Sequence, residues 1–330
     1  MTDRMTYREE NRSMESPHSA PLTELLGKDS IPDYRDTILD QPGAADSPEQ
    51  PAKAPARTLL SRQQLESLRR RLGERDLAIL TAIRMSKYLT SDQVRRLYFM
   101  EHSTPTAAIR AANRNLGKLR EMHLIAAMTR RVGGIRGGSG SYIWHLTEAG
   151  ERLLRLAKPD DSKRRTRFLE PSGRFLRHTL AVAECSIQIR EICERQEELS
   201  LITVDFEPDS WRAYSRIGKI VSLKPDLYAK TLCGEYEDCW FIEVDLGTES
   251  IPAILEQCRR YHDYFLTGLE QEEFGVFPLT VWIVPSAHRR DMLKEAIRKT
   301  FAGQPSLFAV ITPEDLEPLL CQKLNQEALC

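Results

Sequence analysis

The sequence lacks the patterns that several protein classes require. Its apolar runs fall short of the roughly 18 residues that cross a bilayer, so we expect no membrane insertion. The seven cysteines contain no CxxC pair and the seven histidines are scattered, so residues close in sequence do not have the spacing of ligands in a structural zinc site. The first residues are polar and include acids, unlike a secretory signal or a transit peptide. We therefore expect a cytoplasmic protein with reduced thiols and no zinc.

The net charge of −1 conceals a strong segregation of charge along the chain. Residues 57–170 carry 24 basic and 11 acidic side chains, whereas residues 171–330 carry 17 basic and 26 acidic ones. Clustered Lys and Arg displace counterions from nucleic-acid phosphates. Residues 1–56 are acidic and rich in Pro, Ser, Asp and Glu, which predicts a disordered tail. We expect this acidic tail, then a basic domain over 57–170 that binds double-stranded DNA, then a second domain over 171–330.

The basic domain has the pattern of a winged helix-turn-helix. Apolar residues recur at helical spacing, the cap residues Thr90 and Thr104 precede two of the helices, and two strand-like segments flank a Gly-rich turn. The expected helices cover residues 61–72, 74–85, 90–99, 105–122 and 147–156, and the expected strands cover 124–131 and 142–146. A helical core with a β-hairpin wing and a closing helix is an arrangement that binds duplex DNA.

The helix over 105–122 is the candidate recognition helix. A turn of 100° per residue predicts a buried face made of Ile109, Ala112, Leu116 and Leu119. The outer face then holds small and basic residues, namely Ala107, Arg110, Ala111, Arg114 and Lys118. Arginines on such a face can reach guanine edges, and alanines allow a close approach to thymine methyl groups. We expect Arg110 and Arg114 to read bases and Lys118 to contact phosphate; the alternative is a solvated stripe with Glu121 as an ion-pair partner.

The predicted wing is also basic. Arg130, Arg131 and Arg136 surround a Gly-rich tip that has no bulky side chain. Such a tip can lower a cation into a minor groove or along a ridge of phosphates. We expect these three arginines to contact DNA, and the alternative is an exposed hairpin with incidental arginines.

The second half of the chain alternates helices and strands. A helix over 175–194 has apolar residues on two faces, which indicates burial between layers. The strands expected after it cover 201–206, 221–229, 239–245, 279–285 and 307–311, and the helices cover 251–265, 289–301 and a segment from 313. This order predicts an α/β sandwich around one mixed sheet. The expected fold class is therefore α+β, with a winged helix-turn-helix followed by an α/β domain.

Acidic residues lie at two of the predicted strand ends. Lys224-Pro225-Asp226 is predicted on one strand, and Glu243-Val244-Asp245 ends the next. Glu243 and Asp245 point to the same face because side chains alternate along a strand. Carboxylates at neighbouring strand ends can share Mg²⁺ or Mn²⁺. Asp226, Glu243 and Asp245 are therefore candidate metal ligands; the alternative is that these acids only end strands and cap turns.

The sequence resembles the replication-relaxation family of plasmid and mobile-element proteins from about residue 72 to residue 265. The matching segments of the first half are Glu74-Arg75-Asp76, Leu89-Thr90, Leu116 to Leu124, Tyr142, and Leu146 to Gly150. Those of the second half are His178 to Glu184, Lys224-Pro225-Asp226, and Glu243 to Glu249. The resemblance implies an N-terminal winged helix and a role in plasmid replication or DNA relaxation.

The second half also looks like the PD-(D/E)xK nuclease fold. That resemblance implies that an acid on the first helix, the Asp of Pro-Asp and an acid on a later strand bind Mg²⁺, with a Lys beside the attacking water. Asp226 and Glu243 match the strand acids, and Glu184 matches the helix acid, unless it is simply solvated. Asp245 stands at the Lys position, where a carboxylate cannot stabilise a developing oxyanion.

Three functional hypotheses follow, and the sequence leaves them open. The first is a DNA-binding protein of a mobile element, with a degenerate nuclease-like domain that assembles with other replication or mobilisation proteins. The second is an active Mg²⁺-dependent endonuclease that uses the same acids. The third is a transcriptional repressor in which the α/β domain forms a homodimer.

Overall fold

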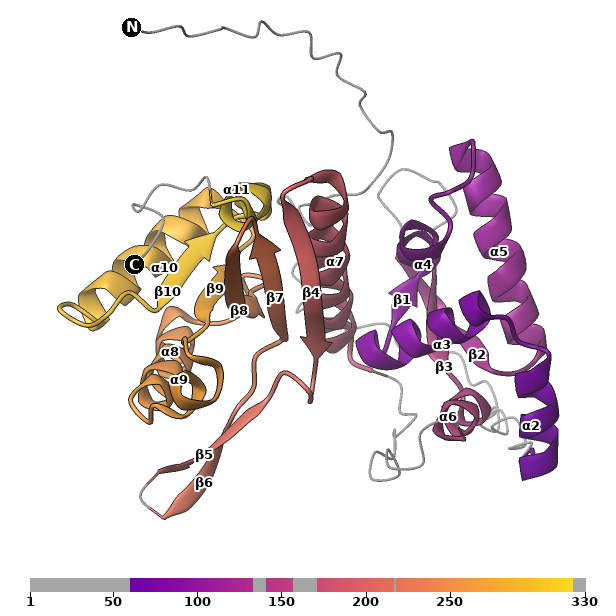
Figure 1. The fold of residues 1–330 in the computed structure, drawn as a ribbon, viewed down its shortest axis with the longest axis horizontal. Helices are drawn as coiled ribbons and strands as arrows, with labels where there is room; N and C mark the ends of the chain where they lie inside the picture. Colours follow the sequence, from indigo (N-terminus) through magenta and orange to yellow (C-terminus); the bar gives the residue numbers. More distant parts are fainter. Residues whose placement is uncertain (1–59, 133–140, 157–170, 217, 323–330) are drawn as a thin grey trace, which may run out of the picture.

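The computed structural model describes residues 60–132, 141–156, 171–216 and 218–322, with the backbone alone for 129–132 (Figure 1). The predicted acidic tail, the tip of the predicted wing and the basic link that follows it lie outside these ranges. We refer to residues 60–156 as the first unit and to residues 171–322 as the second unit. No helix within the described ranges is long and apolar enough to cross a membrane.

The first unit contains the helices and strands that its sequence predicts and one short strand, β1, that it does not. They are α2 (Arg62–Arg70), α3 (Glu74–Ser86), β1 (Leu89–Thr90), α4 (Ser91–Tyr98), α5 (Pro105–Glu121), β2 (Ile125–Val132), β3 (Ser141–Leu146) and α6 (Glu148–Arg155). The predicted caps are present, because the hydroxyl groups of Thr90 and Thr104 accept hydrogen bonds from backbone N–H groups of α4 and α5. β1 is too short for periodicity to reveal; it pairs with β3 and completes a three-stranded antiparallel sheet.

A glycine in α6 closes the first unit. A Cβ atom at Gly150 would lie 2.1 Å from the carbonyl oxygen of Leu124, so only glycine fits at this contact. Thr147 caps the same helix and donates its hydroxyl to the carbonyl oxygen of His123. The segment Thr147-Glu148-Ala149-Gly150 therefore fixes α6 against the turn that leads into β2.

The second unit is built around a five-stranded mixed sheet. Its elements are α7 (Gly173–Arg195), β4 (Leu199–Phe206), β5 (Arg212–Arg216), β6 (Lys219–Leu223), β7 (Leu227–Cys233), β8 (Tyr236–Val244), α8 (Ile251–Phe265), α9 (Leu269–Phe274), β9 (Leu279–Ile283), α10 (Ala287–Thr300), β10 (Phe308–Ile311), η2 (Pro313–Asp315) and α11 (Leu316–Leu320). The strand order is β10-β9-β8-β7-β4, with β8, β9 and β10 parallel and the other two pairings antiparallel. Helices α7 and α11 pack on one face, and α8 and α10 on the other. The predicted mixed sheet is confirmed.

The predicted strand over 221–229 is wrong, because this segment contains two strands. β6 ends at Leu223, a short connection holds Lys224-Pro225-Asp226, and β7 begins at Leu227. Pro225 has no N–H group to donate to a sheet, so the chain leaves one strand there and enters another. β6 instead pairs with β5 in a hairpin that projects from the main sheet (Figure 1). Neither β5 nor α9 follows from the sequence pattern.

Helix α7 packs in the cores of both units. Ala183 and Ile187 belong to the hydrophobic core of the first unit, whereas Cys185 and Ile189 belong to that of the second. The prediction of a helix with two buried faces is therefore confirmed. The domain limits at residues 170 and 171 stay predictions, and the helix that follows them is shared.

Candidate functional site

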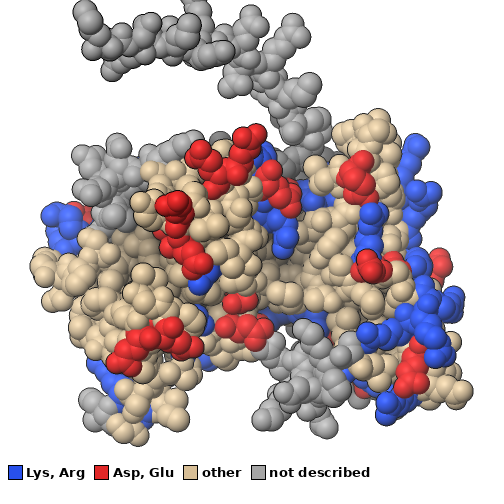
Figure 2. Space-filling view, viewed as in Figure 1, with Lys and Arg blue, Asp and Glu red and all other residues tan. Residues whose placement is uncertain are grey.

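Helix α5 presents a polar face to solvent along one edge of the molecule. Its exposed residues are Pro105, Thr106, Ile109, Arg110, Asn113, Arg114, Arg120 and Glu121. Figure 2 shows Lys and Arg side chains gathered at the edge where α5 and α2 lie in Figure 1. Within the described part of the chain, neither Arg110 nor Arg114 forms an ion pair. Both guanidinium groups are therefore available to an external anion or base.

The predicted orientation of α5 needs two corrections. The sequence predicts Ile109 as buried, but it is 49% exposed. It predicts Ala111 on the outer face, but Ala111 is 9% exposed and belongs to the core. The reason is that the small side chains of Ala108 and Ala111 complete the core together with Leu116, which turns Ile109 outward. Ala107 is half-buried beside this face.

The rotated face contains a polar residue that the sequence reasoning missed. Asn113 is exposed and lies three residues after Arg110 and next to Arg114, so it shares their side of α5. Its amide can donate to and accept from an adenine edge. The spacing from Arg110 is the signal that could have identified it.

Lys118 is held by an acid of another helix. Its Nζ lies 2.5 Å from Oδ2 of Asp76, which also accepts a hydrogen bond from the backbone N–H of Gly73, while Asn115 donates to Oδ1. Burial raises the pKa of Asp76, but the hydrogen bonds from Lys118, Gly73 and Asn115 outweigh this effect, so the pKa lies below its ordinary value. The partner is Asp76 of α3, not Glu121, and Lys118 joins α5 to α3.

The three arginines of the predicted wing are placed only in part. Arg130 and Arg131 lie in β2, where the backbone alone is described, and Arg136 lies outside the described residues. Their contact with DNA stays a prediction.

The predicted acids Asp226, Glu243 and Asp245 lie where β8 ends and β7 begins, and Glu207, which the sequence reasoning missed, lies at the end of β4. We call this group, made of Glu207, Asp226, Glu243 and Asp245, the acidic edge. Oδ2 of Asp226 accepts a hydrogen bond of 2.8 Å from the backbone N–H of Val244, which ties the start of β7 to the end of β8. The same oxygen lies 3.2 Å from Nε2 of His178 on α7. Asp226 therefore has a neighbouring cation when the imidazole is protonated.

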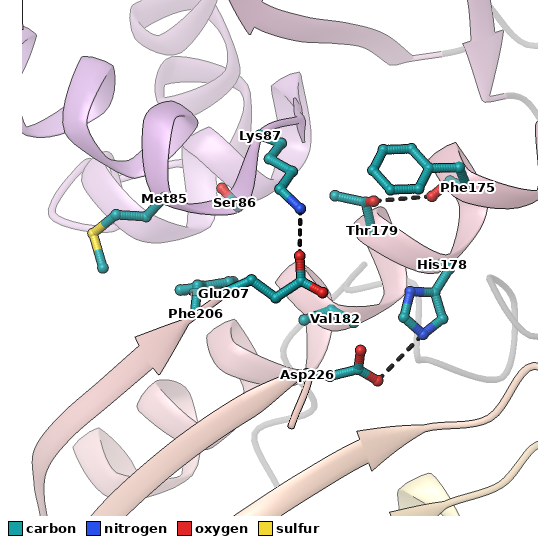
Figure 3. A pocket seen from close by; sticks show the side chains of 10 residues that line it. All are labelled: Met85, Ser86, Lys87, Phe175, His178, Thr179, Val182, Phe206, Glu207 and Asp226. Carbon is teal, nitrogen blue, oxygen red and sulfur yellow. Dashed lines mark hydrogen bonds and ion pairs between the residues drawn. The ribbon is translucent and has the colours of Figure 1, made fainter. Parts of the chain in front are cut away.

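His178 lies beside a small cavity between the two units. Figure 3 shows Lys87 directed toward Glu207, and His178 toward Asp226. The cavity has a volume of about 40 Å³, which suits water-sized groups rather than a nucleotide. Burial lowers the pKa of His178, but the hydrogen bond and negative charge of Asp226, with Glu207 and Glu249, raise it more, so the pKa lies above its ordinary value.

Glu243 is buried behind Tyr261. Oε1 of Glu243 accepts a hydrogen bond of 2.6 Å from the hydroxyl of Tyr261 on α8. Burial and the charge of Asp226 raise the pKa of Glu243 well above its ordinary value, and the hydrogen bond from Tyr261 offsets only part of this rise. The carboxyl of Glu243 therefore tends to hold a proton.

Asp245 is neutralised by an arginine that is distant in sequence. Nε of Arg289 on α10 lies 2.7 Å from Oδ2 of Asp245, and the backbone N–H of Gly247 donates to Oδ1. Both carboxylate oxygens therefore already have partners. Among the described residues, no group of three or more His, Cys, Asp and Glu side chains is arranged to hold a metal ion. Metal binding by Asp226, Glu243 and Asp245 stays a prediction, and in this structure the carboxylate of Asp245 is paired with Arg289.

Glu184 is bound by side chains of α4 in the first unit. Its carboxylate is 2% exposed and lies 2.5 Å from NH1 of Arg96 on α4, and Gln93 donates to it as well. Glu191, two turns further along α7, binds the same guanidinium. The solvated alternative is wrong for Glu184, because it belongs to a buried ion cluster between the units, and its role as the helix acid of a nuclease stays a prediction.

Glu243 also lines a second, larger cavity. Its volume is about 320 Å³, and it is lined by Ser222, Leu223, Lys224, Glu243, Gln257, Arg260 and Tyr261. We call it the β6–α8 cavity. The sequence reasoning missed the contributions of α8, although Gln257, Arg260 and Tyr261 recur at the three- and four-residue spacing that places side chains on one helix face.

These elements define a mixed α+β protein with a five-stranded mixed sheet. The model of the replication-relaxation family matches residues 80–280, more than half of the chain, and the chain belongs to this family. No curated protein matches it. A solved structure titled restriction endonuclease FokI is similar over 84% of this chain and 75% of its own, with 14% sequence identity and a TM-score of 0.24. This likeness is weak and carries no argument about function.

Proposed function

We propose that this chain binds duplex DNA and acts in the replication or relaxation of a plasmid or another mobile element. The order of helices and strands in the first unit, with a short β1 paired to a hairpin, matches the arrangement of a winged helix-turn-helix. In that arrangement α5 is the helix that enters the major groove. Membership of the replication-relaxation family supports the biological setting.

The exposed face of α5 is the observation that carries this proposal. Arg110, Asn113 and Arg114 are exposed together, and the first carboxylate of α5 comes at Glu121, near its C-terminal end. Arginine pairs with guanine and asparagine with adenine in the major groove. The core beneath the face fixes the backbone of α5, so these side chains start from a rigid element.

The experiment removes both arginines of α5 and measures binding of the full chain to duplex DNA. Arg110→Ala with Arg114→Ala is expected to weaken binding at least about 30-fold, because two bidentate base contacts worth about 1–3 kcal/mol each are lost. Arg298→Ala is the control, since it removes an exposed cation from α10 of the second unit. Equal binding by the double variant and the control would contradict the proposal.

A second candidate function is a Mg²⁺-dependent nuclease with a PD-(D/E)xK-like second unit. Asp226 and Glu243 lie on adjoining chain segments, and Oε2 of Glu243 and Oδ1 of Asp226 have no hydrogen-bond donor in the described structure. Mg²⁺ binds through one or two carboxylates together with water and phosphate oxygens, so this pair fits the ion without Asp245. Bound Mg²⁺ would polarise a phosphate and activate water.

One contact favours this second candidate. The motif position taken by Asp245 lacks a lysine, but Lys224 lines the same cavity as Glu243. A cation and this acid therefore line one cavity. The test is nicking of supercoiled plasmid by the full chain with Mg²⁺ or Mn²⁺. Nicking that disappears in Glu243→Gln supports a nuclease, whereas no nicking by the unmutated chain rejects it.

A further inference from the structure

The β6–α8 cavity has the polar lining of a ligand site. It lies between the end of β6 with its following connection and one face of α8, and Glu243 lines it. Its volume of about 320 Å³ falls in the range of small-molecule sites. It is therefore large enough for a nucleotide, unlike the cavity of Figure 3.

Two cations of the cavity have no carboxylate partner among the described residues. Nζ of Lys224 lies over the ring of Trp211, 4.4 Å from its centroid, and the side chain of Arg260 is exposed without an ion pair. Other cations nearby are already occupied, because Arg259 pairs with Glu256 and Arg216 with Asp263. Lys224 and Arg260 are thus free to bind an anion.

The one carboxylate among the residues that line the cavity is engaged by another group. Glu243 is buried, and its Oε1 accepts a hydrogen bond from the hydroxyl of Tyr261. Neither Lys224 nor Arg260 forms an ion pair with it in the described structure. The positive charges of Lys224 and Arg260 therefore stay without a carboxylate partner although the second unit as a whole is acidic.

One further polar atom of the lining lacks a partner among the described residues. Oε1 of Gln257 is buried and has no hydrogen-bond partner in the structure, and a buried acceptor of this kind is costly unless a water or a ligand donates to it. Ser222 adds an exposed hydroxyl at the opposite wall. The cavity therefore offers positive charge, a hydroxyl and an unpaired amide oxygen.

We propose that the β6–α8 cavity binds a phosphate group of a nucleic-acid strand, with Lys224 and Arg260 as its cationic ligands. The size of the cavity favours a nucleotide of a strand over a bare phosphate ion. The unpaired oxygen of Gln257 accepts a hydrogen bond from the sugar or base attached to that phosphate. This inference rests on the proposed function, because the strand belongs to the DNA that the first unit holds.

The adjoining hairpin extends the same surface. Residues 211–224 contain four basic side chains and no carboxylate, and the hairpin of β5 and β6 projects from the sheet (Figure 1). Lys219 has no ion pair in the described chain and lies on β6 before the cavity. A strand bound at Lys224 can therefore continue along β6.

The experiment uses the full chain and a single-stranded tetrathymidylate with a 5′-phosphate, which is too short to form the duplex that α5 is proposed to read. Binding is followed by calorimetry and by tryptophan fluorescence, because Trp211 lies under Lys224. Lys224→Ala with Arg260→Ala is expected to weaken binding at least about tenfold, since two charge-assisted contacts are lost. Arg259→Ala, one position away on α8, is the matched control and is expected to change binding less than about twofold.

The outcomes separate this inference from the proposed function. Arg110→Ala with Arg114→Ala is expected to lose duplex binding and keep binding of the oligonucleotide. If the chain binds duplex but not the oligonucleotide, the cavity assignment is overturned while the proposed function stands. If inorganic phosphate binds as tightly as the oligonucleotide, the ligand of the cavity is a free anion and not a nucleic-acid strand. Equal losses of oligonucleotide binding in the double variant and in Arg259→Ala would mean that only the net charge of the chain matters, and the cavity assignment would be overturned.

Discussion

The exposed face of α5 and the acidic edge of the second unit treat their charges in opposite ways. On α5, Arg110 and Arg114 are exposed and lack ion pairs in the described chain. At the acidic edge, Asp226 is paired with His178, and Asp245 is paired with Arg289. Charged side chains that bind an external partner are expected to lack ion pairs within the protein, whereas charged side chains that stabilise the fold are paired with other residues of the chain. The comparison therefore favours α5 as a binding surface and gives the acidic edge at least a structural role.

The largest expected effect tests whether paired charges hold the units together. Arg96→Ala is expected to lower the free energy of unfolding by about 3–5 kcal/mol, because Glu184 then stays buried without its cation. Arg95→Ala is the control on the same helix; its partner Asp92 is exposed and stays in contact with water when the cation is removed, so a smaller loss of about 1 kcal/mol is expected. Urea unfolding of both variants measures the difference. Similar losses would mean that the buried ion cluster does not clamp α4 to α7.

A second prediction concerns the buried carboxyl of Glu243. Its pKa is raised in the folded protein by burial and by Asp226. Near pH 4 both folded and unfolded chains hold the proton, so Glu243 costs nothing there. As the pH rises above the ordinary value of 4.5, the unfolded chain loses the proton first, so stability falls. Glu243→Gln is therefore expected to melt at a higher temperature than the unmutated chain at pH 7–8, with the difference vanishing near pH 4.

Glu237→Gln supplies the control for this pH dependence. Glu237 lies at the start of the same strand, where it is exposed and pairs with Lys230. No stabilisation at neutral pH is expected from it. A Glu243→Gln variant that is less stable than the unmutated chain at pH 7–8 would show that Glu243 is ionised and needed as a charge.

A smaller effect is expected at His178. The charge of Asp226, with Glu207 and Glu249, outweighs burial and raises the pKa of His178, so its contribution to stability is complete below the ordinary pKa of 6.5 and is lost as the pH rises through the raised value. Asp226→Asn is expected to lower the pKa of His178, measured from the imidazole proton resonances during a pH titration. If the titration midpoint of His178 is the same in Asp226→Asn and in the unmutated chain, Asp226 is not the residue that raises the pKa of His178.

The contrast between the regions also explains what the sequence could predict. The helices and strands of the first unit follow from local signals such as Thr90, Thr104 and the apolar spacing, and they lie within a few residues of the predicted limits. The face of α5 that is exposed was predicted less well. Helical spacing of the larger apolar side chains favours Ile109 as a buried residue, but in the structure Ala108 is buried and Ile109 is exposed.

The charge states of the residues at the acidic edge depend on partners that no local sequence pattern reveals. Arg289 reaches Asp245 from α10, and Tyr261 reaches Glu243 from α8. The motif predicts which acids gather at one end of the sheet, but their charge state depends on these distant residues. Glu184 shows the same limit, because its partner Arg96 lies 88 residues earlier in the chain.

The smallest expected effect is on Lys118, which separates an anchoring residue from a reading residue on one helix. Because Lys118 binds Asp76, Lys118→Ala is expected to lower stability modestly and to leave the preferred DNA sequence unchanged. The measurement is the melting temperature together with selection of binding sites from random duplexes. A changed sequence preference would place Lys118 among the residues that read bases.

Selection from random duplexes with Arg114→Ala tests the central claim most directly. If α5 reads the major groove, the unmutated chain selects a defined sequence, and Arg114→Ala loses the preference at one base pair while the other positions are retained. Asn113→Ala is expected to lose it at a neighbouring position. If both variants select the same sequence as the unmutated chain, α5 does not read DNA and the account is contradicted.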